Sequence, residues 1–327
     1  MKIIRRSVLR HLLCGATLAA CTLMAQAQDN TVHMLVGFAP GGITDVVARV
    51  LAQGMQAETG RNFVVENRAG AGGQIAAQAL KTARPDGTTI YLTNSHTTAM
   101  IPLTMLNPGY DVARDFTPVG LVATTPNFFI VNPDVVGSNV DSLKAFADWA
   151  KAHPAMGNVG VPAPASTPEF SVTALSKAFG VDLRPVAYRG DAPEVQDMVA
   201  GQLPAGVCSI AAAAPYVKTG KLRLLAVDGS ERLKAFPDVP TYHELGLKGL
   251  DDVIFLGVIA PAGTPADVIA KYTAAINKVV HSQSFADRVL DLGVIPRTGT
   301  PDDLWKLTDA SRQSNAALLK MAEYKPQ

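Results

Sequence analysis

The feature of this sequence that most restricts its fold is a repeated order of apolar strand, glycine turn and amphipathic helix. An apolar run over 32–38 leads into a Gly-Gly turn, and apolar residues then recur at helical spacing over 46–51, before Gly60. The same order recurs around later apolar runs at 63–65, 89–93, 118–124, 181–187 and 222–227. Strands separated by helices are typical of mostly parallel sheets that helices cover, so the sequence predicts an α/β protein.

The N-terminus has the pattern of an export signal. Basic residues in the first ten positions precede an uncharged apolar run over 12–25, which is too short to span a bilayer. Small residues end this run in an Ala-Gln-Ala site, so cleavage after Ala27 would leave Gln28 as the first residue. We therefore expect residues 1–27 to be a signal peptide and the mature protein to be periplasmic.

Two features leave the export route and the mature N-terminus open. Leu-Ala-Ala-Cys over 18–21 is a lipobox pattern, in which Cys21 would be acylated and become the N-terminus. Arg5 and Arg6 loosely resemble a twin-arginine signal, although adjacent arginines are also common in ordinary signal peptides.

The composition excludes several classes of function. Lys plus Arg number 29 against 28 for Asp plus Glu, without a long basic run, so a nucleic-acid partner is not expected. The histidines lack metal-ligand spacing, and no hydrolase or phosphate-loop motif occurs, so we expect neither metal nor cofactor. After simple cleavage Cys208 is the one cysteine left, which excludes an internal disulfide.

The turn at 37–45 is the first candidate binding site, because it ends a buried strand and opens a helix. Glycines allow successive N–H groups to converge on an anion, and the helix N-terminus adds partial positive charge. Alternatively, Gly41 and Gly42 only form a tight turn and Asp45 caps the helix. The residues themselves support both interpretations.

A second glycine cluster, at 70–73, lacks the features of a dinucleotide-binding turn. Ile75 stands where the third glycine belongs, and no acidic residue follows about 20 positions later. The cluster instead predicts the start of a helix. Farther along, His96 follows a strand directly and so lies at the sheet edge where ligands of α/β proteins collect.

These stretches, with several others in the same order, make the chain resemble one family. The stretches that carry the resemblance are 39–49, 65–73, 85–87, 188–190, 220–223, 226–227, 237–241 and 257–265. Together they resemble the Bug-type receptors of tripartite tricarboxylate transport, from about residue 32 to the C-terminus.

The resemblance implies a two-lobed periplasmic binding protein of type II-like α/β fold, with two hinge crossings, near Phe129 and near Val227. The lobes would comprise 28–128 with the return segment 228–327, and 129–227. Such receptors close on small organic acids, amino acids and related compounds, and the loop 38–45 matches their first binding loop. The resemblance also implies a monomer whose partner is a membrane permease or the ectodomain of a sensor kinase.

The second binding loop departs from the family pattern. The family has Ser-Ala-Gly-x-Gly-Thr-x-Ser-His where this chain has Val-Pro-Ala-Pro-Ala-Ser-Thr-Pro-Glu over 161–169, so glycines become Ala or Pro and the histidine becomes Glu169. Proline has no N–H to donate, whereas Ser166 and Thr167 still offer hydroxyls. Farther along, the family's acidic residue is replaced around Cys208, and its cleft tryptophan by Phe255.

Glu169 has two interpretations. Facing the cleft, it would repel a second carboxylate, which favours a monocarboxylate, an amino-acid-like molecule or a near-neutral ligand. Facing outward, it would only cap the helix that starts there.

The expected function is therefore capture of a small organic acid or amino-acid-like molecule by a receptor that is not an enzyme. The alternative is an exported enzyme that uses Glu169, His96 or Asp45 as acid or base, although no nucleophile and base arrangement is evident. The expected ligand-binding residues are Phe38, Ala39, Gly41, Gly42, Thr44 and Asp45 on one wall, Ser166, Thr167 and Glu169 on the other, and in addition Ser95, Thr97, Tyr188 and Asp191.

Overall fold

The computed structural model describes residues 30–247, 249–250 and 252–327. The expected signal peptide, its cleavage site at Ala27 and Gln28, and the alternative lipid anchor Cys21 lie outside the described residues. No helix in the described part of the chain is long and apolar enough to cross a membrane.

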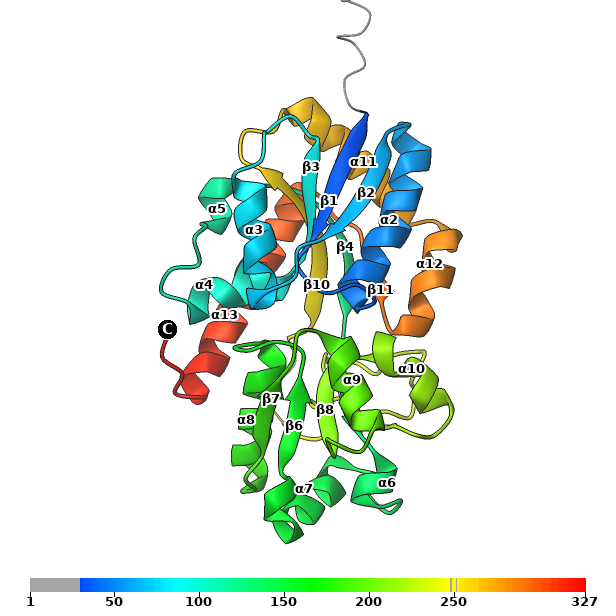
Figure 1. The fold of residues 1–327 in the computed structure, drawn as a ribbon, viewed down its shortest axis with the longest axis vertical. Helices are drawn as coiled ribbons and strands as arrows, with labels where there is room; N and C mark the ends of the chain where they lie inside the picture. Colours follow the sequence, from blue (N-terminus) through cyan, green and yellow to red (C-terminus); the bar gives the residue numbers. More distant parts are fainter. Residues whose placement is uncertain (1–29, 248, 251) are drawn as a thin grey trace, which may run out of the picture. The chain divides into compact units, whose positions relative to one another are not determined.

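The first lobe is built on a six-stranded sheet with the strand order β11-β4-β10-β3-β1-β2 (Figure 1). Its strands are β1 (Thr31–Val36), β2 (Asn62–Asn67), β3 (Thr89–Asn94), β4 (Phe116–Thr125), β10 (Ile254–Pro261) and β11 (Ile295–Pro296). Its helices are α2 (Ile43–Thr59), α3 (Gln74–Lys81), α4 (Ile101–Thr104), α5 (Val112–Asp115), α11 (Ala266–Val280), α12 (Gln283–Val289) and α13 (Pro301–Met321), with the short turns η1 (Ala71–Gly73), η2 (His96–Met100) and η4 (Leu290–Leu292).

The second lobe is built on a five-stranded sheet with the strand order β7-β6-β8-β5-β9. Its strands are β5 (Asn127–Val131), β6 (Asn158–Val161), β7 (Arg184–Ala187), β8 (Ala205–Ser209) and β9 (Arg223–Val227). Its helices are α6 (Pro133–Val136), α7 (Leu143–Ala152), α8 (Thr167–Phe179), α9 (Asp191–Val199) and α10 (Ile210–Lys218), with the short turn η3 (Pro154–Met156). The predicted two-lobed α/β fold is confirmed.

The sheets are mixed, which corrects the expectation of mostly parallel pairing. β1 pairs with β3, and β6 with β7 and β8, in parallel, but β10 and β5 each run antiparallel to both of their neighbours. β5 and β10 are the strands that receive the chain from the other sheet. Each therefore starts at the edge of its new sheet where the neighbouring strands end, and so it runs in the opposite direction to those neighbours.

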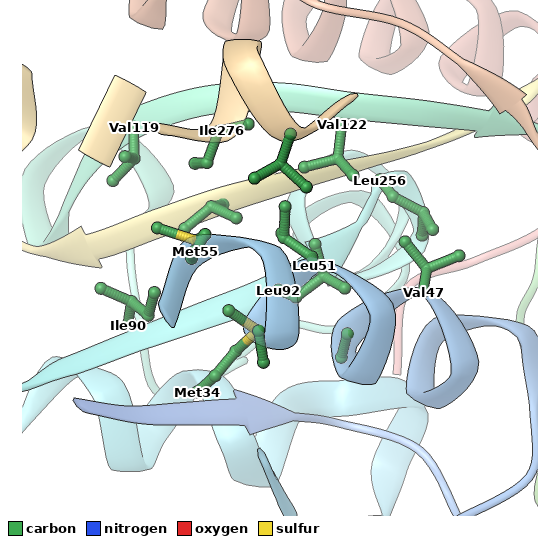
Figure 2. Packing of buried hydrophobic residues seen from close by; sticks show 14 of the residues in the cluster. Met34, Val47, Leu51, Met55, Ile90, Leu92, Val119, Val122, Leu256 and Ile276 are labelled. Atoms are coloured by element: carbon green, nitrogen blue, oxygen red, sulfur yellow. The ribbon is translucent and has the colours of Figure 1, made fainter. Parts of the chain in front are cut away.

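The first lobe has a core on each face of its sheet because strand side chains alternate between faces. Met34, Ile90 and Leu256 pack with α2, α11 and α12 (Figure 2), whereas their strand neighbours Leu35 and Tyr91 pack with α3 and the start of α13. Helices are therefore required on both faces, as the sequence predicted.

The second lobe repeats this arrangement. Phe129 packs with α7 and α8 on one face of the sheet, and Phe128 packs with α9 and α10 on the other. The C-terminal helix α13 joins both lobes, since Leu304 lies in a core of the first lobe while Leu318 and Leu319 pack among residues of the second.

Leu51 of α2 tests this packing. It is fully buried among β1, β3 and β10 in the core that Figure 2 shows. Leu51→Ala should lower the free energy of unfolding by about 2–5 kcal/mol, because it removes buried methyl groups and leaves a cavity. Leu106→Ala, at a side chain that is 78% exposed, is the matched control and should change it by less than about 0.5 kcal/mol. Equal losses in urea denaturation would contradict the assignment of Leu51 to the core.

Candidate functional site

One cavity receives the carboxyl ends of strands from both sheets. Its volume is about 60 Å³, several times the space that one water molecule needs. The first lobe contributes Phe38, Ala39, Pro40, Gly42, Ile43, Thr44, Asn94, His96, Thr125, Ile254 and Leu256 to its lining. The second lobe contributes Asn127, Pro162, Ala163, Ser166, Thr167, Pro168, Arg189, Gly190, Asp191, Ala192, Pro193 and Ser209.

The N-termini of helices α2, α8, α9 and α10 all lie in this lining. The lining residues at these starts are Gly42 for α2, Ser166 for α8, Gly190 for α9 and Ser209 for α10, and each is the N-cap of its helix. The first amides of a helix have no partner within the helix, and the helix dipole places partial positive charge there. The cavity is therefore electropositive through its backbone, which favours an anion.

Arg189 adds a full positive charge. Its side chain is exposed, lines the cavity, and makes no hydrogen bond or ion pair with any residue that the structure describes. A guanidinium binds a carboxylate through two parallel N–H groups. The geometry thus provides a charged partner for a bound acid, and the sequence analysis did not single out this residue.

The first binding loop combines both interpretations of the turn at 37–45. Phe38, Ala39, Gly42 and Thr44 line the cavity, but Gly41 and Asp45 do not. Gly41 has the left-handed φ of 87°, which favours glycine, and its N–H donates to Asp45 Oδ2 at 3.0 Å. The Gly41 amide is therefore used inside the loop, and the amides at the start of α2 are left to meet a ligand.

Asp45 is a structural anchor of this loop. Its buried carboxylate accepts hydrogen bonds from Arg49 at 2.9 and 3.0 Å, from Asn67 Nδ2 at 2.8 Å, and from Gly41. Burial alone would raise the pKa of Asp45, but these donors outweigh it and hold the pKa below its usual value. Asp45 is therefore ionised and already fully hydrogen-bonded.

The hydroxyls of the second binding loop are hydrogen-bonded within the protein. Ser166 Oγ donates to the Ala163 carbonyl at 2.6 Å and accepts from the Glu169 amide, while Thr167 Oγ1 donates to Asn315 Oδ1 of α13 at 3.1 Å. Ala165, which replaces a family glycine, keeps a left-handed φ of 50°. The loop thus retains a turn that suits glycine, although its sequence no longer contains one.

Glu169 caps helix α8. Its Oε2 accepts the Ala165 amide at 2.6 Å, and Glu169 is absent from the described lining of the cavity. Burial raises the pKa of this carboxyl, and the Ala165 hydrogen bond partly opposes the rise. Glu169 thus bonds at the start of its own helix, and its expected role toward a ligand stays an untested prediction.

Three other expected residues also lie outside the cavity lining. Thr97 Oγ1 donates to the Gly72 carbonyl at 3.0 Å, Tyr188 donates to Asp197 Oδ2 at 2.7 Å, and Ser95 is buried at the end of β3. Their binding roles stay untested predictions, as do those of the residues that do line the cavity.

Asp191 and His96 are the titratable groups that line the cavity beside Arg189. Burial raises the pKa of Asp191 to about 6, although Ser209 opposes this by donating to the carboxylate. Burial lowers the pKa of His96 to about 4, so the ring is neutral near pH 7. Its Nδ1 has no hydrogen-bond partner among the described residues.

Two glycines of the cluster at 70–73 pack closely against His96 and Thr97. A Cβ on Gly72 would lie 2.3 Å from His96 Nε2, and one on Gly73 would lie 2.4 Å from Thr97 Oγ1. Gly73 is also the N-cap of α3, as the sequence analysis expected of this cluster. No group of three or more His, Cys, Asp or Glu side chains in the described ranges is placed to hold a metal ion.

Asp45→Asn tests the anchor in the first loop. A carboxylate with a depressed folded pKa stabilises the fold above its unfolded pKa, and this stabilisation is lost as pH falls through the folded pKa. The substitution should therefore lower the free energy of unfolding at pH 7 by about 1–3 kcal/mol and reduce its decline below pH 4. Thermal denaturation between pH 3 and 7 measures both effects.

The control is Asp148→Asn, which removes an exposed pair between positions i and i+4 with Lys144 and should cost at most about 0.5 kcal/mol. A wild-type acid dependence that persists in Asp45→Asn would show that Asp45 is not the anchor.

Comparisons with known proteins agree with this geometry. The model of the tripartite tricarboxylate transporter family receptor matches residues 47–323. The BugT protein of Bordetella pertussis is 33% identical over 294 residues, which cover 88% of this chain and 89% of BugT.

Two solved structures of similar proteins contain ligands. R. palustris Rpa4515 with adipate has a TM-score of 0.85 and 29% identity, over 91% of this chain and 98% of that one. MatC from Rhodopseudomonas palustris with bound malate has a TM-score of 0.80 and 30% identity, over 88% and 98%. The chain therefore belongs to the tripartite tricarboxylate transporter receptor family, whose members are periplasmic solute-binding proteins.

Proposed function

We propose that this protein is an exported receptor that captures a small carboxylate and delivers it to a permease of the tripartite tricarboxylate type or to a sensor kinase ectodomain. The observation that carries the proposal is the set of helix N-termini around one cavity, together with the guanidinium of Arg189, which bonds to no residue that the structure describes. Both favour an anion, and similar proteins have been solved with adipate and malate.

Capture would occur by hinge closure of lobes at 28–128 with 228–327, and 129–227. The two segments that link the sheets support this. They meet where Asn127 Nδ2 donates to Asp228 Oδ2 and the Asp228 amide donates to the Asn127 carbonyl, both at 3.0 Å. Asn127 also lines the cavity, so a residue of the hinge could contact a bound ligand. A ligand that contacts both lobes shifts the population toward the closed form.

A receptor rather than an enzyme is the function that these side chains favour. Two of the three candidate acids or bases, Glu169 and Asp45, lie outside the described lining and bond within the protein. His96 lines the cavity, but no described residue bonds to its Nδ1 and so orients the ring as a base. Turnover of a bound carboxylate would overturn this part of the proposal.

Arg189→Gln tests the anion site. Loss of a charge-assisted hydrogen bond of about 1.5–3 kcal/mol should raise the Kd of a bound carboxylate about 10- to 100-fold. Isothermal titration calorimetry measures this against a panel that includes adipate, malate and four-carbon acids. Arg84→Gln is the control, because Arg84 is exposed and outside the cavity lining, and its affinities should match those of the wild type. Unchanged binding in Arg189→Gln would contradict the site.

A further inference from the structure

Asp191 is an acid in a cavity whose other features favour an anion. It lines the cavity, is 7% exposed, and stands at the first position of α9. Helix α9 has no side-chain cap at Gly190, and the carboxylate accepts the hydroxyl of Ser209, the N-cap of α10. Capping its own helix therefore does not account for the place of Asp191.

The surroundings of Asp191 make a second negative charge unfavourable there. Glu194, one turn farther along α9, is fully buried, with its carboxyl over Gly160 and Gly206 of the sheet. Burial, followed by the nearby charge of Asp191, raises the pKa of Glu194 well above its usual value. The charge of Asp191 already opposes the ionisation of Glu194, and a ligand carboxylate beside Asp191 would add a further unfavourable negative charge. A hydrogen-bond donor or a cation would be stabilised there instead.

His96 supplies an independent sign that a polar ligand group belongs in this cavity. It is 6% exposed and lines the cavity, and its Nδ1 has no hydrogen-bond partner in the described part of the chain. Its Nε2 edge lies against Gly72. Nδ1 is thus a buried nitrogen without a partner among the described residues, which costs about 1–3 kcal/mol unless a ligand or water completes it.

Arg189 and Asp191 lie two positions apart on one loop and both line the cavity. A molecule that contacts both residues would carry a carboxylate for Arg189 and a hydrogen-bond donor for Asp191. A carboxylic acid with an amino or hydroxyl group on the neighbouring carbon has this arrangement. A plain dicarboxylate would bring a second negative charge to Asp191 instead.

We propose that Asp191 is the specificity-determining residue of this receptor, and that the ligand is a monocarboxylate with an adjacent amino or hydroxyl donor, bound through Arg189 and Asp191 respectively. This proposal rests on the carboxylate-binding function proposed above. It narrows that function to a class of ligand that differs from adipate.

Calorimetry with four-carbon acids tests the proposal. The probes are 2-aminobutyrate, 2-hydroxybutyrate, butyrate and succinate, with adipate and malate as further dicarboxylates. Since a hydrogen bond to a charged group contributes about 1.5–3 kcal/mol, 2-aminobutyrate or 2-hydroxybutyrate should bind at least about tenfold more tightly than butyrate and succinate. Whichever of the two binds more tightly identifies the donor.

Asp191→Asn should remove this preference, by weakening the donor-bearing acid about tenfold or more relative to butyrate. Asp267→Asn is the matched control, because Asp267 is an exposed acid in the first turn of α11 and lies outside the cavity lining. If Asp191→Asn fails to fold, Ser209→Ala serves instead. It removes the hydroxyl that holds Asp191 and should weaken the donor-bearing acid relative to butyrate.

The outcomes separate the two proposals. Tighter binding of succinate or adipate than of 2-aminobutyrate and 2-hydroxybutyrate, or a preference that survives both variants, would overturn the role of Asp191 but leave a carboxylate receptor. Absence of binding to every acid, in wild type and variants alike, would overturn the carboxylate receptor itself.

Discussion

The structure depends on one constraint, which is that strands followed by helices end at a common edge of each sheet. The helices that follow therefore begin at that edge, and the N-termini of α2, α8, α9 and α10 gather around one cavity. The two strands that arrive from the other sheet run the opposite way, so they begin there. Strands of both directions, and the helices between them, therefore meet the cavity at their ends rather than at their middles.

This constraint separates the groups that build the cavity from those that bind in it. Asp45, Glu169 and the hydroxyl of Ser166 all serve helix starts or loop turns. They fix the backbone amides in position, and so contribute to an anion site indirectly. Arg189, Asp191 and His96 are the ionisable side chains in the described lining, and the first two carry opposite charges near neutral pH. Affinity for an acid and discrimination among acids can thus reside in different groups.

The sequence predicted the helix after Gly41-Gly42 and the fold class, because glycine turns and helical periodicity are local signals. It did not predict strand β10 as such, because its run Ile-Phe-Leu-Gly-Val-Ile-Ala-Pro has no alternation and a buried strand and a buried helix look alike in such a run. The antiparallel direction of β5 and β10 depends on which sheet each joins, and no local pattern carries that information.

Side-chain roles were harder to predict than backbone elements. Thr97 and Tyr188 are polar and follow strands, yet their hydroxyls bond to Gly72 and Asp197, partners that only the folded chain brings near. Arg189 belongs to the Tyr-Arg-Gly stretch that carries the family resemblance, but the absence of a partner for it among the described residues depends on every neighbour in the fold. Asp191 was expected at the site together with Glu169, but the two acids bond differently. Glu169 accepts an amide at the start of its own helix, whereas Asp191 of α9 accepts the hydroxyl of Ser209 at the start of α10.

Native mass spectrometry of the protein purified from the periplasm without refolding tests the central claim most directly. The account predicts a retained small acid, released on unfolding and diminished in Arg189→Gln. Repeated native preparations without any bound mass, combined with no calorimetric response to the carboxylate panel, would contradict the claim that the helix N-termini and Arg189 form an anion site.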